Sequence, residues 1–302
     1  MTAVLEAPGP FTVGLPPGRV GLRRAMAAEW TKLWSVRSTT WTLVATGVAV
    51  LGLCALSTAT ISPSDLIEDP TRRSLVGIFL GQLIFGVLGV LVMSAEYGTG
   101  TIRATLSAVP RRPLVLAAKI LVFGAVALVV SEILAFTAFS VGQAILSTKH
   151  AVGPSTAIAQ HAHQLGVKVP SNLHTLLSSS GSASLGQAGV LRAVVGAGLY
   201  LAVLGLLALG LATIIRHTAG AISAFVGIVL VLPLIVQALP MSISNAVARY
   251  LPANIGLVMF STHGAPDRVG PAFSPWVGFA LLALYTGVTL GIGCWVLVRR
   301  DA

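Results

Sequence analysis

Glu132 is the residue whose type and position point most directly to chemistry. It lies near the middle of an otherwise uncharged apolar run, Leu121–Leu146. A carboxylate is costly to place in hydrocarbon, so such residues usually face a protein interior and carry function. One interpretation is a transport-path or coupling residue that burial keeps protonated. The other is a structural hydrogen bond to a neighbouring helix, or a run whose true position brings Glu132 nearer an interface.

Other patterns that could do chemistry are sparse. Four histidines fall in the segment 147–187, and a histidine pair with one residue between is a possible metal ligand. No carboxylate or cysteine lies nearby and the surrounding sequence is of low complexity, so a solvated loop is favoured over a metal site. These histidines are His150, His161, His163 and His174.

Catalytic and nucleotide-binding motifs are absent from the sequence. It contains no G-x-x-x-x-G-K-S/T phosphate loop, no H-E-x-x-H and no G-x-S-x-G. Cys54 and Cys294 lie inside apolar runs and form neither a disulfide framework nor a metal knuckle. We therefore predict that the chain is not an enzyme and binds no nucleotide, metal or cofactor itself.

A polar and basic stretch, EYGTGTIRATLSAVPRR, separates two apolar runs at Glu96–Arg112. It predicts a short helix that a hydroxyl of Thr99 or Thr101 caps and that Pro110 ends. Glu96 would lie near the positive N-terminal end of this helix. One face would carry the apolar side chains and another Arg103, which suits docking in a groove on a second protein. The apolar residues of that face are Ile102, Leu106 and Val109.

Composition defines the elements that must position these residues. Hydrophobic residues make up 55% of the 302-residue chain and charged residues only 9%, whereas a soluble domain carries roughly a quarter charged residues. The apolar residues form six continuous runs of the length of a membrane-spanning helix, and their lack of alternation argues against a membrane β-barrel. We predict an all-α integral membrane protein with six transmembrane helices, at Trp41–Ile61, Leu75–Ala95, Leu121–Leu146, Ala193–Ile215, Ala219–Leu239 and Trp276–Val298.

The basic residues predict the orientation of these spans. With the N-terminus in the cytoplasm, twelve of the 19 lysines and arginines fall in cytoplasmic segments and seven in external ones, which is the expected bias. Both termini are then cytoplasmic. The net charge of +10 indicates contact with anionic lipid headgroups rather than nucleic acid, because no basic stretch is interleaved with aromatics.

The segment before the first span predicts an amphipathic helix that lies in the membrane interface. Leu22, Met26, Trp30 and Leu33 fall on one stripe, and the cations lie largely away from it. The alternative is a basic tail without this structure. The cations are Arg23, Arg24, Lys32 and Arg37. Residues 1–20 are expected to be a disordered tail, residues 21–300 a single permease domain, and 147–187 a flexible external loop.

The stretch between spans two and three resembles the signature E-x-x-x-G-T followed by L-x-x-x-P-x-R of permease subunits of ATP-binding-cassette (ABC) transporters, in the type-2 exporter family. RRAMAAEWTKLWSVRSTTWTL at the N-terminus and the segment from Ser184 to Ile222 are similar to actinobacterial members. The resemblance runs from Leu22 to Arg300. The residues that match the signature are Glu96, Gly100, Thr101, Leu106, Pro110 and Arg112.

This resemblance implies a multi-pass permease of the cell membrane, whose short helix couples to a separate cytoplasmic ATPase that binds ATP and Mg²⁺. A second permease copy, normally identical, would complete the path, and two external re-entrant helices would lie between spans five and six. The docking residues would be Thr101, Ile102, Arg103, Thr105, Leu106 and Pro110, with Glu96 orienting the helix. There are two alternative functions. One is a secondary transporter or channel that needs no ATPase, but the sequence shows no internal repeat. The other is an intramembrane enzyme, but no paired catalytic groups lie in the predicted spans.

Overall fold

A computed structural model describes residues 21–35, 37–60, 69–109, 111–148, 182–262 and 272–299 of the protein. Over these residues the chain forms helices and no strand. Six helical segments are long and apolar enough to cross a membrane, so the predicted all-α architecture with six candidate spans is confirmed. They are α2 (Arg37–Ala59), α4 (Ile78–Gly98), α6 (Arg112–Thr148), α9 (Val190–Ile215), the continuous segment Thr218–Gln237, and α14 (Pro275–Arg299).

Five short helices complete the described part of the chain. They are α1 (Leu22–Ser35), α3 (Pro70–Ser74), α5 (Thr101–Ala108), α12 (Met241–Ala248) and α13 (Pro252–Met259). The last two are the pieces predicted between spans five and six, and their re-entrant course stays a prediction. Residues 1–20, Pro110 and the histidines of the segment 147–187 lie outside the described residues.

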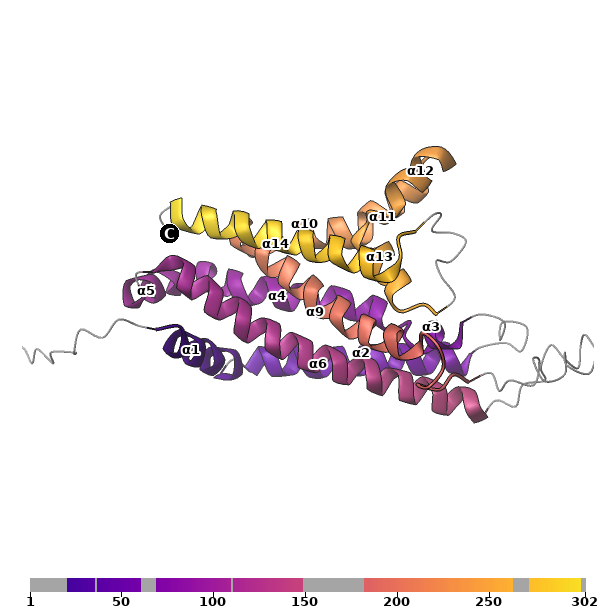
Figure 1. Ribbon diagram of the computed structural model, residues 1–302. Coiled ribbons are helices and arrows are strands. Elements are labelled where there is room, and N and C mark those ends of the chain that lie inside the picture. Colours follow the sequence, from indigo (N-terminus) through magenta and orange to yellow (C-terminus); the bar gives the residue numbers. More distant parts are fainter. Residues whose placement is uncertain are drawn as a thin grey trace, which may run out of the picture.

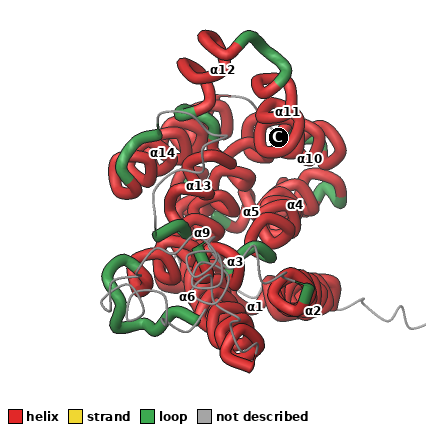
Figure 2. The backbone as a smooth tube through the Cα atoms, turned by 90° about the vertical axis from the view of Figure 1, so that its right-hand side faces the viewer, coloured by secondary structure: helices red, strands yellow, loops and turns green. Residues whose placement is uncertain are grey.

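Helix α9 forms the centre of the bundle and packs against α4, α6 and α14 (Figure 2). Glycines allow this close packing, because a Cβ on Gly89 of α4 would collide with the Gly205 carbonyl of α9. A buried hydrogen bond of 2.6 Å from the Tyr200 hydroxyl to the Gln82 Oε1 also joins α9 to α4. The core therefore surrounds α9, and the outer faces of the other spans remain apolar and exposed.

Elements far apart in sequence meet at two ends of the bundle (Figure 1). Helices α1 and α5 and the C-terminal end of α14 lie at one end, which we call the α5 end; α3 and α12 lie toward the other. At the α5 end Arg112 and Arg216 donate to the Leu297 and Val296 carbonyls, at 3.0 Å each. These arginines satisfy carbonyls that the last turn of α14 leaves without helical partners.

Two spans differ from the runs predicted from sequence. Helix α6 begins at Arg112 rather than Leu121 and has 37 residues, a length of about 55 Å at the usual rise. It exceeds the roughly 30 Å of bilayer hydrocarbon, so an upright α6 is longer than a single span needs.

The fifth span consists of α10 (Thr218–Val226), the π-helical turn η2 (Gly227–Val231) and α11 (Leu232–Gln237). The π turn ends two residues before Pro233, which has no N–H to donate, and the wider turn accommodates this loss. Beyond it α11 and α12 lean away from the bundle (Figure 1).

Candidate functional site: a four-residue ion cluster beside α5

Four charged residues meet at the α5 end of the bundle and form what we call the ion cluster: Glu29 and Lys32 of α1, Glu96 of α4 and Lys119 of α6. The Lys119 ammonium lies 2.6 Å from the Glu29 Oε2 and 3.0 Å from the Glu96 Oε1. The Lys32 ammonium lies 3.0 Å from the Glu29 Oε1 and 2.9 Å from the same Glu96 Oε1. The cluster has no formal net charge and joins three helices.

The sequence produces this meeting point in simple steps. Glu29 and Lys32 are three residues apart on α1, so they share one face of that helix. Glu96 lies in the last turn of α4, and Lys119 lies two turns into α6, facing back toward it. The side chains of Lys119, Glu29 and Glu96 are only 3%, 8% and 10% exposed. Charges so deeply buried are tolerated only when they are paired, which explains the reciprocal arrangement.

Burial and pairing act in opposite directions on Lys32. Partial burial lowers the pKa of its ammonium, but hydrogen bonds and the negative charges of Glu96 and Glu29 outweigh that effect, so the pKa is raised above 10.5. Lys32 therefore stays protonated throughout the physiological range.

Lys32 also connects the ion cluster to α5, because its ammonium donates to the Thr105 hydroxyl at 3.3 Å. On the same helix Ile102 is buried at 3% exposure and Leu106 packs partly buried against the core. Arg103 and Ser107 are exposed. The apolar face predicted to dock on a second protein thus packs against its own bundle, and the polar face is outward.

The predicted hydroxyl cap of α5 is wrong. Gly100 is the N-cap residue, with a φ of +69° and no side-chain cap hydrogen bond. Glycine adopts this left-handed conformation without strain, so it makes the turn between α4 and α5. The Thr99 hydroxyl instead donates to the Ala95 carbonyl at 2.8 Å, back toward α4.

The structure separates the other residues of the matched motif. Glu96 belongs to the ion cluster, where two lysines contact it, and Thr101 is exposed at the start of α5. Arg112 does not share this site, because its guanidinium binds the end of α14. The motif therefore contributes to two separate contacts and to the exposed start of α5 rather than to one surface.

Helix α1 packs on α6 through a face that differs from the predicted stripe. Its buried residues are Ala25, Glu29 and Leu33, whereas Leu22 and Trp30 of the predicted stripe are 38% and 50% exposed. Arg23, Arg24 and Arg37 are exposed, and Lys32 alone among the four predicted cations points into the ion cluster. The exposed Trp30 and Trp34, with ring centroids 5.8 Å apart, suit headgroup depth.

Glu132 lies apart from the ion cluster, on α6 against α9. A Cβ on Gly198 would lie 2.5 Å from its carboxyl carbon, so the glycine provides the room that the carboxyl group occupies. The Glu132 Oε2 is buried and has no hydrogen-bond partner among the described residues. Neighbouring Val129 and Ile133 are 57% and 62% exposed, which places Glu132 at the edge of the bundle surface. Both interpretations of this residue remain open.

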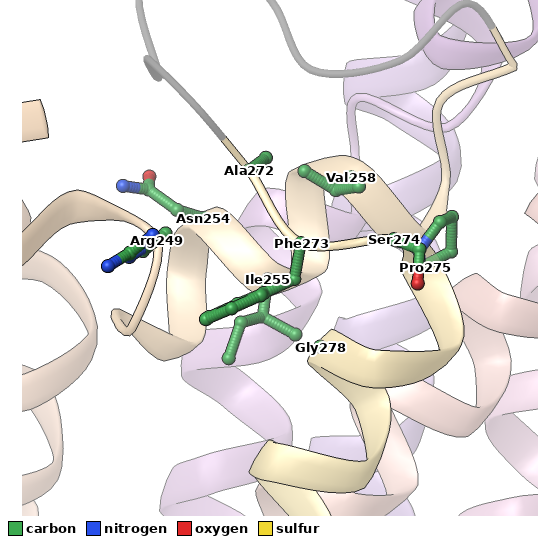
Figure 3. Close-up of a pocket in the computed structure, with 9 residues that line it drawn as sticks. All are labelled: Arg249, Asn254, Ile255, Val258, Ala272, Phe273, Ser274, Pro275 and Gly278. Carbon is green, nitrogen blue, oxygen red and sulfur yellow. The ribbon is translucent and has the colours of Figure 1, made fainter. Parts of the chain in front are cut away.

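Two cavities among the described residues differ greatly in size. One of about 400 Å³ adjoins the ion cluster and is lined by all four of its members. The other, between α13 and the start of α14, has about 10 Å³, the space of one water molecule. Arg249 lies beside it, 5.4 Å from the Phe273 ring centroid, and Asn254 and Ile255 complete its wall (Figure 3). This cavity is too small for a ligand and belongs to the packing of α13 against α14.

Metal chemistry has no support in the part of the chain that the structure describes, where no group of three or more histidine, cysteine or carboxylate ligands occurs. His217 accepts a hydrogen bond from the Gly220 N–H and caps α10. The predicted absence of a metal site is untested for the histidines in the segment 147–187.

The sequence pattern did not single out Glu29 or Lys119, and it predicted Lys32 at the membrane interface. The sequence does contain a signal for the ion cluster. Glu29 lies three residues before Lys32, and Glu96 and Lys119 are single charges next to apolar runs, where each charge needs a partner. A scan against protein-family models and a search of curated proteins find no match to this chain. Its function must therefore be argued from the geometry.

Proposed function

We propose that this chain is the membrane-spanning permease subunit of an ABC exporter and that a separate ATPase docks on α5. The observation that supports this most is the attachment of α5: a short helix between two spans, whose Ile102 is buried in the core and whose Thr105 accepts a hydrogen bond from the ion cluster. A displacement of α5 is thereby passed to α1, α4 and α6 through bonded groups.

The proposed mechanism needs no chemistry from this chain. ATP and Mg²⁺ bind to two cytoplasmic ATPase subunits, which close on each other and move the two docked α5 helices. The membrane part switches because its two conformations differ in affinity for the closed ATPases. A second copy of the permease would complete the translocation path, in the cell membrane and with both termini in the cytoplasm.

The docking surface in this proposal is the outward face of α5. Ile102 and Leu106 pack inward, so the ATPase would contact the exposed Thr101, Arg103, Ala104 and Ser107. This set differs from the predicted docking residues, which also included Ile102, Thr105, Leu106 and Pro110. A substitution of Leu106 would disturb the bundle itself and is a poor test of docking.

The alternative is a secondary transporter or channel that works without an ATPase. An ABC-type ATPase encoded beside this chain would favour the permease, and transport by the purified chain without nucleotide would favour the alternative. Neither proposal requires Glu132 to have a particular role.

Co-purification tests the docking surface directly. The full chain is expressed with the neighbouring ATPase subunit, and we expect the ATPase to be recovered with the wild type but lost with Arg103→Glu and with Ser107→Arg. Arg23→Glu, which makes the same charge reversal on exposed α1, is the matched control and should retain it. Recovery with both α5 variants refutes docking on α5, and no recovery with the wild type rejects the ABC assignment.

A further inference from the structure

The cavity of about 400 Å³ beside the ion cluster has the size of small-molecule sites, which range from roughly 300 to 1,000 Å³. It is bounded mainly by residues of α1, α2 and α4, with Thr101 of α5 and Lys119 of α6. Its position follows from how α2 and α4 pack: they touch closely at Val50 and Gly77, where a Cβ would collide with the Val50 carbonyl. Toward the α5 end the two helices leave a space that no described side chain fills.

The walls of this cavity are apolar on one side and charged or hydroxylic on the other. Leu88, Leu91 and Val92 of α4 supply the apolar wall, and the ion cluster with Thr39 of α2 supplies the polar end. Ser35, Ala95 and Thr99 also line it and are exposed, so the cavity opens to the surroundings. An occupant must therefore be amphiphilic, with a polar group at the ion cluster and an apolar part along α4.

The hydrogen bonds that the two lysines already make determine which polar head group the cavity can hold. An ammonium has three N–H donors, and both lysines use all three within the protein. Lys32 donates to Glu29, Glu96 and Thr105, and Lys119 donates to Glu29, Glu96 and the Val92 carbonyl. Neither lysine has a proton left for an anionic ligand.

The vacant position in the cluster is an acceptor. The Glu96 Oε1 accepts from both lysines, whereas the Glu96 Oε2 is buried and accepts no hydrogen bond from the described residues. The Glu96 side chain is nine-tenths buried and lines the cavity, but its Oε2 is closed to water, so a ligand N–H reaches this oxygen only after the carboxylate turns toward the cavity. A buried acceptor without a donor costs free energy that a ligand N–H can recover.

We propose that this cavity binds an amphiphile with a primary ammonium head, which donates to the Glu96 carboxylate while its hydrocarbon chain lies along Leu88, Leu91 and Val92. The added positive charge meets a cluster of zero formal charge that contains two carboxylates and no uncommitted lysine proton. A membrane aminolipid and a free alkylamine share this chemistry. The proposal needs no ATPase and therefore stands apart from the proposed function.

Equilibrium binding to the full chain in phosphatidylcholine nanodiscs tests the proposal, because choline has no N–H. The probe is radiolabelled dodecylamine, and the competitors are unlabelled dodecylamine, dodecyltrimethylammonium, dodecyl phosphate and lysophosphatidylethanolamine. We expect saturable binding that dodecyltrimethylammonium displaces about tenfold or more weakly than dodecylamine, the factor that one hydrogen bond to a charged group is worth. Displacement by lysophosphatidylethanolamine identifies an aminolipid as the source, and its failure leaves a free amine.

Two variants test the location. Ala95→Phe fills the cavity and keeps all four charges of the ion cluster, and it should abolish saturable binding; Ala283→Phe, on the exposed face of α14, is the matched control and should leave it unchanged. Glu96→Gln, checked for an intact thermal transition, should also weaken binding. Non-saturable partition equal in all variants, equal displacement by dodecyltrimethylammonium, or stronger displacement by dodecyl phosphate would each overturn the proposal.

Discussion

Replacing Lys119 by methionine gives the clearest test of the ion cluster. Methionine keeps the volume and removes the charge, leaving the carboxylates of Glu29 and Glu96 with Lys32 as their only cation in the cluster. The two carboxylate side chains are no more than 10% exposed, so water cannot screen the surplus negative charge. Loss of one partner from a buried pair typically costs about 3–5 kcal/mol, and we expect a loss of folding stability in that range.

A compensating substitution separates charge from packing. Lys119→Met combined with Glu29→Gln restores zero net charge and leaves the pair of Lys32 and Glu96, so most of the lost stability should return. Arg111→Met, an exposed cation just before α6, is the control and should change stability by less than about 0.5 kcal/mol.

Unfolding of the purified chain in mixed micelles, followed by helical circular dichroism, gives the four free energies of the double-mutant cycle. Glu29→Gln alone completes the cycle, and the coupling energy should be favourable by at least about 1 kcal/mol for groups in contact. Additive effects of the two substitutions, or a Lys119→Met variant as stable as the wild type, would refute the claim that these charges hold α1 and α6 together.

Two further predictions concern Lys32 and the helix contacts. Because the pKa of Lys32 is raised above its ordinary value of 10.5, its ionic stabilisation is complete below that pH and is lost as the pH rises through the folded-state pKa. The stability difference between the wild type and Lys32→Met should therefore stay constant from neutral pH to about 10 and shrink above 10.5 in pH-dependent unfolding; a difference that grows would contradict the pairing. Gly77→Ala should lower stability by about 1–3 kcal/mol, because its Cβ meets the Val50 carbonyl. Gly287→Ala, where nothing lies within 4 Å, should be neutral or stabilising, and unfolding in mixed micelles followed by circular dichroism measures both variants.

The six candidate spans could be predicted from the sequence, because a run of about 20 apolar residues is typical of a membrane-spanning helix. The sequence was also sufficient for the existence and length of α5, since glycines and an apolar period mark such a helix. It could not tell where the apolar face of α5 points. An amphipathic pattern shows only that one face is buried, and the structure buries Ile102 against its own bundle.

The sequence signals only the local part of the ion cluster, the pair of Glu29 and Lys32 three residues apart. Other bonds of the cluster join Lys119 to Glu29 across 90 residues and to Glu96 across 23, and no local pattern specifies such pairs. Basic residues near spans are ordinarily explained by headgroups, and this explanation fits Arg23 and Arg24, which are exposed. It fails for Lys119, which the longer α6 brings inside the bundle.

The position of the ion cluster links the two proposals by thermodynamics. The Lys32 ammonium contacts both Glu96, which lines the cavity, and Thr105 of α5. An occupant that changes the hydrogen bonds of Glu96 also changes the hydrogen bond between Lys32 and Thr105, because one ammonium makes both contacts. A partner that shifts α5 moves Thr105 and so changes the same hydrogen bond. Equilibrium coupling is reciprocal, so the factor by which an amphiphile alters the affinity of an α5 partner equals the factor by which that partner alters the affinity of the amphiphile. If the coupling is favourable, an amphiphile in the cavity strengthens binding of the partner to α5, because the Lys32 ammonium is shared by the two sites.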